Sequence, residues 1–368
     1  MTTQHPIFLK KKLPKLHNEL SIDQLKARLA AETFSRRTVS FYRYVKIEDA
    51  VAIRNSFYSQ WEGLGVLGRV YFAKEGVNAQ VSVPEHNYQQ FLDGICNVFP
   101  GMPMKIAVEE AKESFYKLVV KVRPKILADG LSDDAYDVSN VGRHLSAREF
   151  NEALQQKDAV VVDVRNYFES EIGRFEGALC PNVDSFKDEL PVISDMLAGQ
   201  QDKKILLYCT GGIRCEKASA WLKHQGFSDV NQLHGGIIDY SRQVKEEGLE
   251  NKFVGKNFVF DARMGEKITD AVISKCHQCG APADTHTNCG WEPCHLLFIQ
   301  CKSCAEKMDG CCTSECQTYL GLPSEEKEQM MRKVTASSPA FFRSRRRPQG
   351  FVKVNPAHIS THATDSHT

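Results

Sequence analysis

The sequence lacks an apolar run long enough to cross a membrane, which excludes a membrane-spanning helix. Its first residues, from Met1 to Lys12, lack the apolar core that a signal peptide needs. The formal net charge is only +1, so any binding to nucleic acid must depend on local basic patches. Together these absences predict a cytoplasmic protein with no membrane partner.

Two cofactor signatures are also missing. The sequence contains no two-histidine, one-carboxylate triad for iron and no glycine-rich dinucleotide fingerprint, so there is no flavin or nicotinamide motif. Cysteine, in contrast, is abundant: nine of the 13 cysteines lie between Cys276 and Cys316. Clustered cysteines in a chain without a signal peptide indicate metal binding rather than a disulfide framework.

A chain of 368 residues predicts two or three domains. In residues 38–128, hydrophobic patterns alternate between strand and helix in the order β-α-β-β-α-β. This order predicts a ferredoxin-like (acylphosphatase-like) α+β sandwich. Residues 143–250 alternate more regularly and contain strands that are apolar on both faces, as at 159–164 and 205–208, which predicts an α/β domain with a parallel sheet. A further strand is expected over 257–263.

The expected domain boundaries follow these changes in pattern. They are an N-terminal extension over 1–37, the ferredoxin-like domain over 38–128, a linker over 129–142, the α/β domain over 143–250, a cysteine-rich module over 251–322, and a basic, disordered tail over 323–368. The extension is interpreted as a flexible arm, although residues 21–31 have a short helical pattern.

The most informative stretch is Cys209-Thr-Gly-Gly-Ile-Arg214, which joins a predicted buried strand to a predicted helix. Glycines let successive backbone N–H groups converge on one point, and the helix N-terminus and Arg214 add positive charge there. A cysteine in this place is expected to have a lowered pKa and to react as a thiolate. The alternative is a structural cysteine buried after a core strand.

Several motifs around this loop resemble the rhodanese domain and, within it, the rhodanese-like tRNA uridine-34 hydroxylases, also called the UPF0176 family. The motifs are Asp163-Val-Arg-Asn-Tyr-Phe-Glu169, Ile172-Gly-Arg-Phe-Glu-Gly-Ala178, Cys209-Thr-Gly-Gly-Ile-Arg-Cys-Glu-Lys-Ala218, Leu233-His-Gly-Gly-Ile237, Phe258-Val-Phe-Asp-Ala-Arg263, Gly68-Arg-Val-Tyr-Phe-Ala-Lys-Glu-Gly-Val-Asn78 and Cys276-His-Gln-Cys-Gly-Ala-Pro282. The resemblance covers roughly residues 38 to 322.

This resemblance implies a central rhodanese domain and an oxygen-dependent 5-hydroxylation of uridine at the tRNA wobble position, with the loop cysteine Cys209 as the essential residue. It also implies an anion cradle formed by Thr210, Gly211, Gly212, Ile213 and Arg214, with Asp163 and Arg165 bracing the loop. Asp163 and Arg165 could equally be a buried structural pair. Cys215 could resolve an oxidised Cys209 as a disulfide, or it could simply be a small residue in the first turn of the helix. A persulfide sulfurtransferase that acts on tRNA or on a small thiol acceptor, and a non-catalytic adaptor, remain alternative functions.

The pairs Cys276-x-x-Cys279 and Cys301-x-x-Cys304 have the two-knuckle spacing of a tetrahedral zinc site. Four more cysteines could form a second site, and the two ligand sets could interleave. These are Cys289, Cys294, Cys312 and Cys316. Structural zinc, free or redox-active thiols, and an iron–sulfur cluster are the three interpretations.

The substrate that the resemblance implies, tRNA, is a large anion, so basic patches are candidate contacts. One lies along a predicted strand with Lys117, Lys121 and Arg123, and another lies in the tail with Arg345 and Arg346. Both could instead be solvated charged faces. A tyrosine of the N-terminal domain, Tyr42, Tyr44 or Tyr71, could stack on the splayed wobble base.

Overall fold

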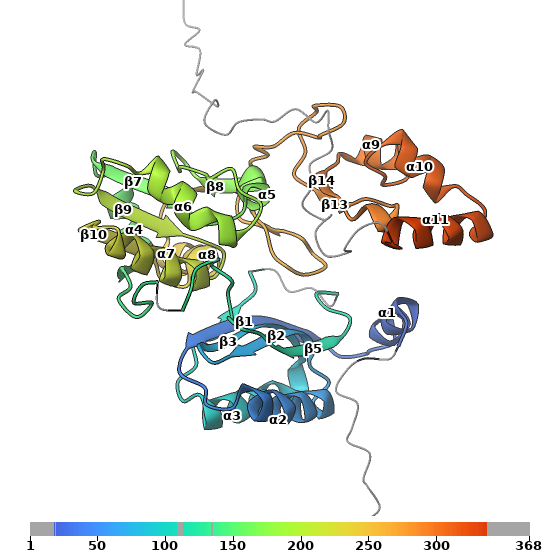
Figure 1. The fold of residues 1–368 in the computed structure, drawn as a ribbon, viewed down its shortest axis with the longest axis horizontal. Helices are drawn as coiled ribbons and strands as arrows, with labels where there is room; N and C mark the ends of the chain where they lie inside the picture. Colours follow the sequence, from blue (N-terminus) through green and yellow to red (C-terminus); the bar gives the residue numbers. More distant parts are fainter. Residues whose placement is uncertain (1–17, 19, 109–112, 134, 337–368) are drawn as a thin grey trace, which may run out of the picture. The chain divides into compact units, whose positions relative to one another are not determined.

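The computed structural model describes residues 18, 20–108, 113–133 and 135–336. They form two compact units, one from residues up to 104 together with 111–126, the other from residues 105–110 together with those from 127 onward (Figure 1). Within the described ranges, no helix is long and apolar enough to cross a membrane.

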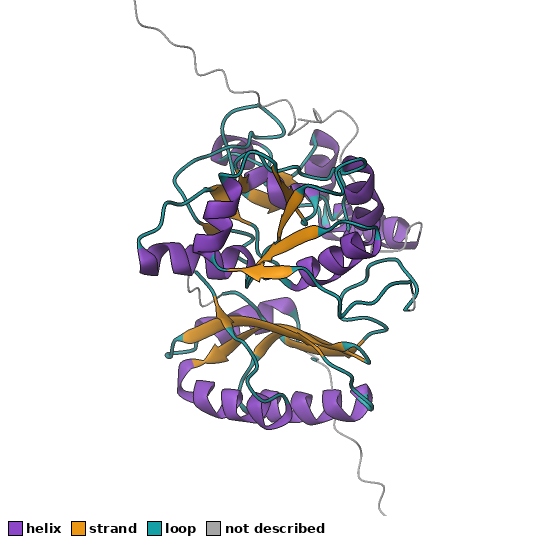
Figure 2. Ribbon diagram, turned by 90° about the vertical axis from the view of Figure 1, so that its left-hand side faces the viewer, coloured by secondary structure: helices purple, strands orange, loops and turns teal. Residues whose placement is uncertain are grey.

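The first unit is a sheet with two helices on one face (Figures 1 and 2). Its strands lie in the order β1-β3-β2-β5; β1, β3 and β2 are antiparallel neighbours, and β5 is parallel to β2. The elements are β1 (Arg36–Tyr44), α2 (Ala50–Gly63), β2 (Leu67–Ala73), β3 (Gly76–Pro84), α3 (Tyr88–Val98) and β5 (Leu118–Val122). Trp61, Phe72 and Phe91 are fully buried between the sheet and the helices. The predicted ferredoxin-like, acylphosphatase-like sandwich is confirmed.

The extension before this sheet is partly helical. Helix α1 (Ile22–Ala30) begins with a reciprocal capping box between Ser21 and Gln24 and buries Leu25 and Leu29. The short helical pattern predicted over 21–31 is therefore confirmed. The interpretation of these residues as part of a flexible arm is wrong, because Leu25 and Leu29 are buried. Residues 1–17 lie outside the described part of the chain.

The second unit contains a parallel sheet in the order β6-β10-β9-β7. Its elements are β6 (Arg143–Leu145), α4 (Ala147–Leu154), β7 (Ala159–Asp163), α5 (Tyr167–Ile172), α6 (Phe186–Met196), β9 (Lys204–Tyr208), α7 (Ile213–His224), β10 (Asp229–Leu233) and α8 (Gly236–Glu247). Strand β9 runs through the centre, and Ile205, Leu206 and Leu207 are all fully buried, so both of its faces are covered. The predicted α/β domain is confirmed.

A small antiparallel sheet continues this unit with β8 (Gly173–Phe175), β11 (Phe253–Asn257) and β12 (Glu266–Lys267). The strand predicted over 257–263 is wrong, because the strand ends at Asn257 and the chain then turns. Arg263 stabilises that turn by donating to both carboxylate oxygens of Asp261, at 2.9 and 2.6 Å.

The cysteine-rich part is a hairpin followed by short helices. Its elements are β13 (His286–Asn288), β14 (Leu297–Ile299), α9 (Lys302–Lys307), α10 (Ser314–Leu320) and α11 (Ser324–Ala336). Helix α11 differs from the disordered tail predicted from residue 323, while residues 337–368 lie outside the described ranges. One further short strand, β4 (Lys105–Ile106), precedes the α/β domain in the sequence and belongs to the second unit.

Candidate active site and metal centres

The loop that begins at Cys209 lies where strand β9 meets helix α7. The backbone N–H of Gly212 donates to the Cys209 sulfur at 3.1 Å. The carbonyls of Cys209 and Thr210 instead accept hydrogen bonds from the N–H groups of Ile237 and Ile238, at 3.0 and 3.2 Å. The first turn of α8 therefore holds the loop carbonyls away from the sulfur, and loop amides face it.

Two glycines make this arrangement sterically feasible. Gly212 is the N-cap of α7 and has a φ of 97°, a left-handed conformation that strains other residues. A Cβ atom on Gly236 would lie 2.5 Å from the carbonyl oxygen of Cys209. Glycine is therefore required where α8 approaches the loop.

The surroundings of Cys209 favour its thiolate. Its complete burial opposes ionisation, but a hydrogen bond from the Cys215 thiol, the charge of Arg214 and the amides of both residues lower its pKa to about 6. Cys215 is also fully buried, and burial together with the neighbouring thiolate raises its own pKa well above the usual value. Cys209 is thus an ionised sulfur at neutral pH and Cys215 a neutral donor to it. The resolving role of Cys215 stays a prediction.

The guanidinium of Arg214 is held by a carboxylate that sequence reasoning missed. Its two terminal nitrogens donate to Glu169 at 2.5 and 2.8 Å, and both side chains are buried. Glu169 also accepts from the Thr210 hydroxyl at 3.2 Å. The spacing Asn166-x-x-Glu169 has the form of a capping box, which the structure contains, and this was the available sequence signal. Arg214 therefore acts on the thiolate through its charge while its terminal nitrogens bind Glu169.

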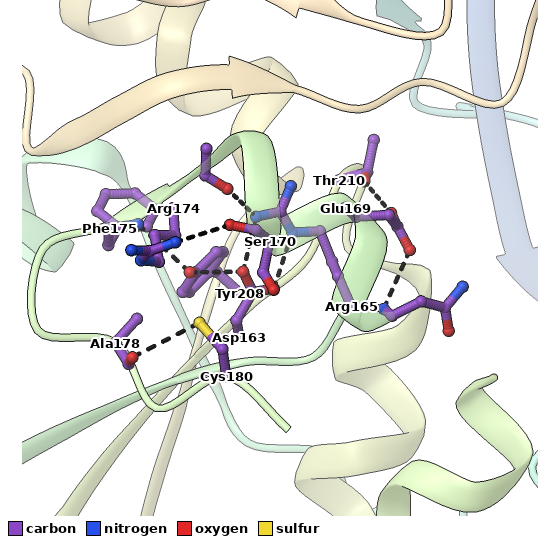
Figure 3. Close-up of polar contacts among 12 residues, drawn as sticks. Asp163, Arg165, Glu169, Ser170, Arg174, Phe175, Ala178, Cys180, Tyr208 and Thr210 are labelled. Carbon is purple, nitrogen blue, oxygen red and sulfur yellow. Dashed lines mark hydrogen bonds and ion pairs between the residues drawn. The ribbon is translucent and has the colours of Figure 1, made fainter. Parts of the chain in front are cut away.

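Asp163 and Arg165 form a fully buried ion pair beside the end of β9 (Figure 3). The Arg165 guanidinium donates to Asp163 at 2.8 and 2.6 Å and to the Gly173 carbonyl at 2.6 Å. The hydroxyl of Tyr208, the residue before Cys209, donates to the same Asp163 carboxylate at 2.7 Å. The pair is thus joined to the loop through Tyr208.

Lys105, on β4, is a second residue that the sequence did not indicate. It is only 5% exposed, and its Cδ lies 3.9 Å from the position a Cβ on Gly211 would take. Burial lowers the pKa of its ammonium, and the charges of Asp239, Cys209 and Glu216 partly oppose that shift. A buried amino group therefore faces the same loop.

The cysteine-rich module contains two groups of four thiols. One group is Cys276, Cys279, Cys301 and Cys304, and the other is Cys289, Cys294, Cys312 and Cys316. Within each group the sulfur atoms lie within 4.8 Å of one another, and either group could hold a metal ion. Along the chain the two sets alternate pair by pair, which is the interleaved arrangement of a cross-braced module.

The distances between sulfurs fit a tetrahedral ion. Four ligands about 2.3 Å from zinc are roughly 3.8 Å apart. The Cys279 and Cys301 sulfurs are 3.6 Å apart in the first group, and Cys312 lies 3.7 Å from both Cys294 and Cys316 in the second. All eight cysteines are free thiols, so they are available as ligands.

The candidate tRNA contacts fall in two places. Lys121 lies on β5, and Lys117 and Arg123 directly flank that strand. All three are exposed and alternate with the buried residues Leu118 and Val120, so they share one side. The tail arginines Arg345 and Arg346 lie outside the described residues.

Three family profiles match consecutive parts of the chain. They are the UPF0176 acylphosphatase like domain over residues 36–126, the Rhodanese-like domain over 146–243 and the Rhodanase C-terminal region over 254–317. Fold and profiles together define a rhodanese-domain protein with an acylphosphatase-like N-terminal domain.

The relatives are more specific. A tRNA uridine(34) hydroxylase of Leptospira interrogans is 54% identical over 341 residues, covering 92% of this chain and 93% of the relative. One of Yersinia enterocolitica is 52% identical over 317 residues, covering 85% of this chain and 91% of the relative. The chain therefore belongs to the tRNA uridine(34) hydroxylase family.

Proposed function

We propose that this protein hydroxylates carbon 5 of uridine 34 in tRNA, with molecular oxygen as co-substrate and Cys209 as the essential residue. The observation that carries the proposal is a buried cysteine of lowered pKa, about 6, in a chain whose relatives are named for this activity. One oxygen atom is inserted into the bond between carbon 5 and its hydrogen, which gives the hydroxyl group. The other oxygen atom is reduced to water with two protons and two electrons from a reductant.

The contacts around Cys209 support a role for each neighbouring residue. Amides of the loop stabilise the negative charge on the Cys209 sulfur. The positive charge of Arg214, whose guanidinium is held by Glu169, stabilises it further. Asp163 and Arg165 hold the loop through Tyr208. The six sequence segments and their boundaries, and the cytoplasmic location, remain predictions.

Nucleoside analysis of tRNA tests this function. Cells that lack the gene are expected to lose 5-hydroxyuridine and its derivatives, and the wild-type gene to restore them. The variant Cys209→Ser should fail. Cys180→Ser is the matched control, because burial raises the pKa of Cys180 to about 12 and it is not a thiolate. Full restoration by Cys209→Ser would contradict the role of Cys209.

The alternative activity is persulfide sulfur transfer, which the same thiolate and amide donors favour. Its product is a thiolated nucleoside. Hydroxylation adds one oxygen atom to the nucleoside, and thiolation replaces one oxygen atom by sulfur. These two changes in mass are nearly equal, so high-resolution mass spectrometry is needed to distinguish the products. A non-catalytic adaptor, in contrast, predicts that Cys209→Ala leaves the cellular phenotype unchanged.

We further propose that each group of four cysteines holds one structural zinc ion. Bound zinc would cross-link the turn that contains Cys276 and Cys279 to the hairpin and to the short helices α9 and α10. Metal analysis of protein purified without air should find two zinc ions per chain. Cys276→Ser and Cys312→Ser should each lose one, while Cys96→Ser, an exposed cysteine of the first unit, should retain both. Iron with sulfide would replace the zinc assignment with a cluster.

A further inference from the structure

The sheet of the first unit has one face that its own helices do not cover. Helices α2 and α3 both lie on the other face (Figure 1). Val39, Phe41, Val70 and Phe72 are buried in the core cluster that includes residues of these helices. Because side chains alternate along a strand, the intervening residues lie on the opposite face. On β1 this face carries Tyr42, which is half-buried.

The strand register places this face's residues in rows. Tyr42 pairs with Asn78, Asn78 with Tyr71, and Tyr71 with Lys121, so the four side chains form one row across four strands. Neighbouring strands are about 4.8 Å apart, so the two tyrosines are separated by about 10 Å. This separation is wide enough for the two rings to contact different bases.

Positive charge accompanies the aromatic rings. The guanidinium carbon of Arg123 lies 5.6 Å from the centre of the Tyr71 ring. Arg69 and Lys121 are exposed on the same face, and strands β1, β2, β3 and β5 contain no aspartate or glutamate. The face thus combines stacking surfaces with charge of one sign.

We propose that this face, defined by Tyr42, Tyr71, Arg69, Lys121 and Arg123, is a platform for single-stranded RNA. Ferredoxin-like sheets with aromatic residues on the open face stack two or three bases in this way. The charge complements phosphates, and the rings stack on unpaired bases, so the occupant is the anticodon loop of the tRNA substrate. This inference rests on the proposed function.

The platform predicts separate effects on loop and duplex RNA. We would measure binding of the full chain to an anticodon stem-loop and to a duplex of equal length without a loop. Tyr42→Leu and Tyr71→Leu should each weaken stem-loop binding by about 5-fold or more, since one stacked base contributes at least that much. Binding to the duplex should change little. Tyr71→Phe should bind as wild type, because it keeps the ring.

Two control variants define the specificity of the effect. Tyr88→Leu removes a half-buried tyrosine from α3, beneath the opposite face, and should leave RNA binding unchanged. Lys121→Ala should reduce the slope of log affinity against log salt by about 0.7, the value for one lost phosphate contact in a single strand. Lys157→Ala, exposed in the second unit, should not.

Failure of the platform and failure of the proposed function give different results. If the wild type hydroxylates tRNA and folded Tyr42→Leu and Tyr71→Leu bind the stem-loop equally well, the platform is overturned alone. If the wild type binds the stem-loop, both leucine variants weaken it, and uridine 34 is never modified, the platform stands and the function fails. A wild type that binds no RNA overturns both.

Discussion

The ionisation of Cys209 gives the sharpest test of the site. The surroundings lower its pKa from 9.0 to about 6, which corresponds to about 4 kcal/mol in favour of the thiolate. At pH 7 the thiolate should make up about 90% of the population, against about 1% for a thiol with the starting pKa. Reactivity at Cys209 should therefore rise with pH through about 6 and then level off.

The largest favourable contribution is the hydrogen bond from the Cys215 thiol. Removing it with Cys215→Ala should raise the pKa of Cys209 to about 7–8, because a hydrogen bond to a charged group contributes about 1.5–3 kcal/mol. The measurement is the ultraviolet absorbance of the thiolate against pH, with the same titration of Cys209→Ser subtracted to remove the other cysteines. An inflection above pH 8 in the wild type would refute the reasoning.

The same pKa shift links stability to pH. The folded pKa lies below the unfolded one, so the stabilisation is fully present above about pH 9 and is lost as the pH falls toward 6. The free energy of unfolding of the wild type, minus that of Cys209→Ser, should therefore increase with pH across this window. Urea titrations at several pH values measure it, and a difference of the opposite slope would contradict the lowered pKa.

Two further predictions concern the charges beside the loop. Glu169→Gln should lower the free energy of unfolding by about 3 kcal/mol in urea titrations, because Arg214 stays buried without its counter-charge. The control Glu247→Gln, which removes one partner of an exposed ion pair, should lower it by less than about 1 kcal/mol. Equal decreases in the two variants would contradict the argument. Lys105→Met should raise the pKa of Cys209 in the absorbance titration while Lys105→Arg should not, and an identical pKa in Lys105→Met would show that the ammonium does not act on the thiolate.

Local patterns predicted most of the fold, because the pattern of apolar and polar residues that defines an element, continuous or alternating, lies within that element. The strand at 205–208 and the helix after Gly212 are examples. The misplaced strand at 257–263 shows the limit, since Phe258 and Phe260 pack their rings together from a turn and produce an apolar alternation without a strand.

Partners distant in sequence could not be predicted in the same way. Glu169 and Arg214 are 45 positions apart, and Lys105 reaches the loop from a two-residue strand with no motif of its own. The cysteine pairs are the exception, because the spacing within a Cys-x-x-Cys pair constrains how its two sulfurs can bind one metal ion. The order of the pairs along the chain also indicates that the two groups could interleave.

The contacts of the loop also define which chemistry it can support. The Gly212, Arg214 and Cys215 amides bind the Cys209 sulfur, and the terminal nitrogens of Arg214 bind Glu169. A separate phosphate would need those same donors, so the thiolate itself already occupies the anion site. An atom added to Cys209 would remain within reach of these donors without requiring new ones. The loop is therefore arranged for chemistry at its own sulfur, and binding of the polyanionic RNA must depend on surfaces elsewhere in the chain.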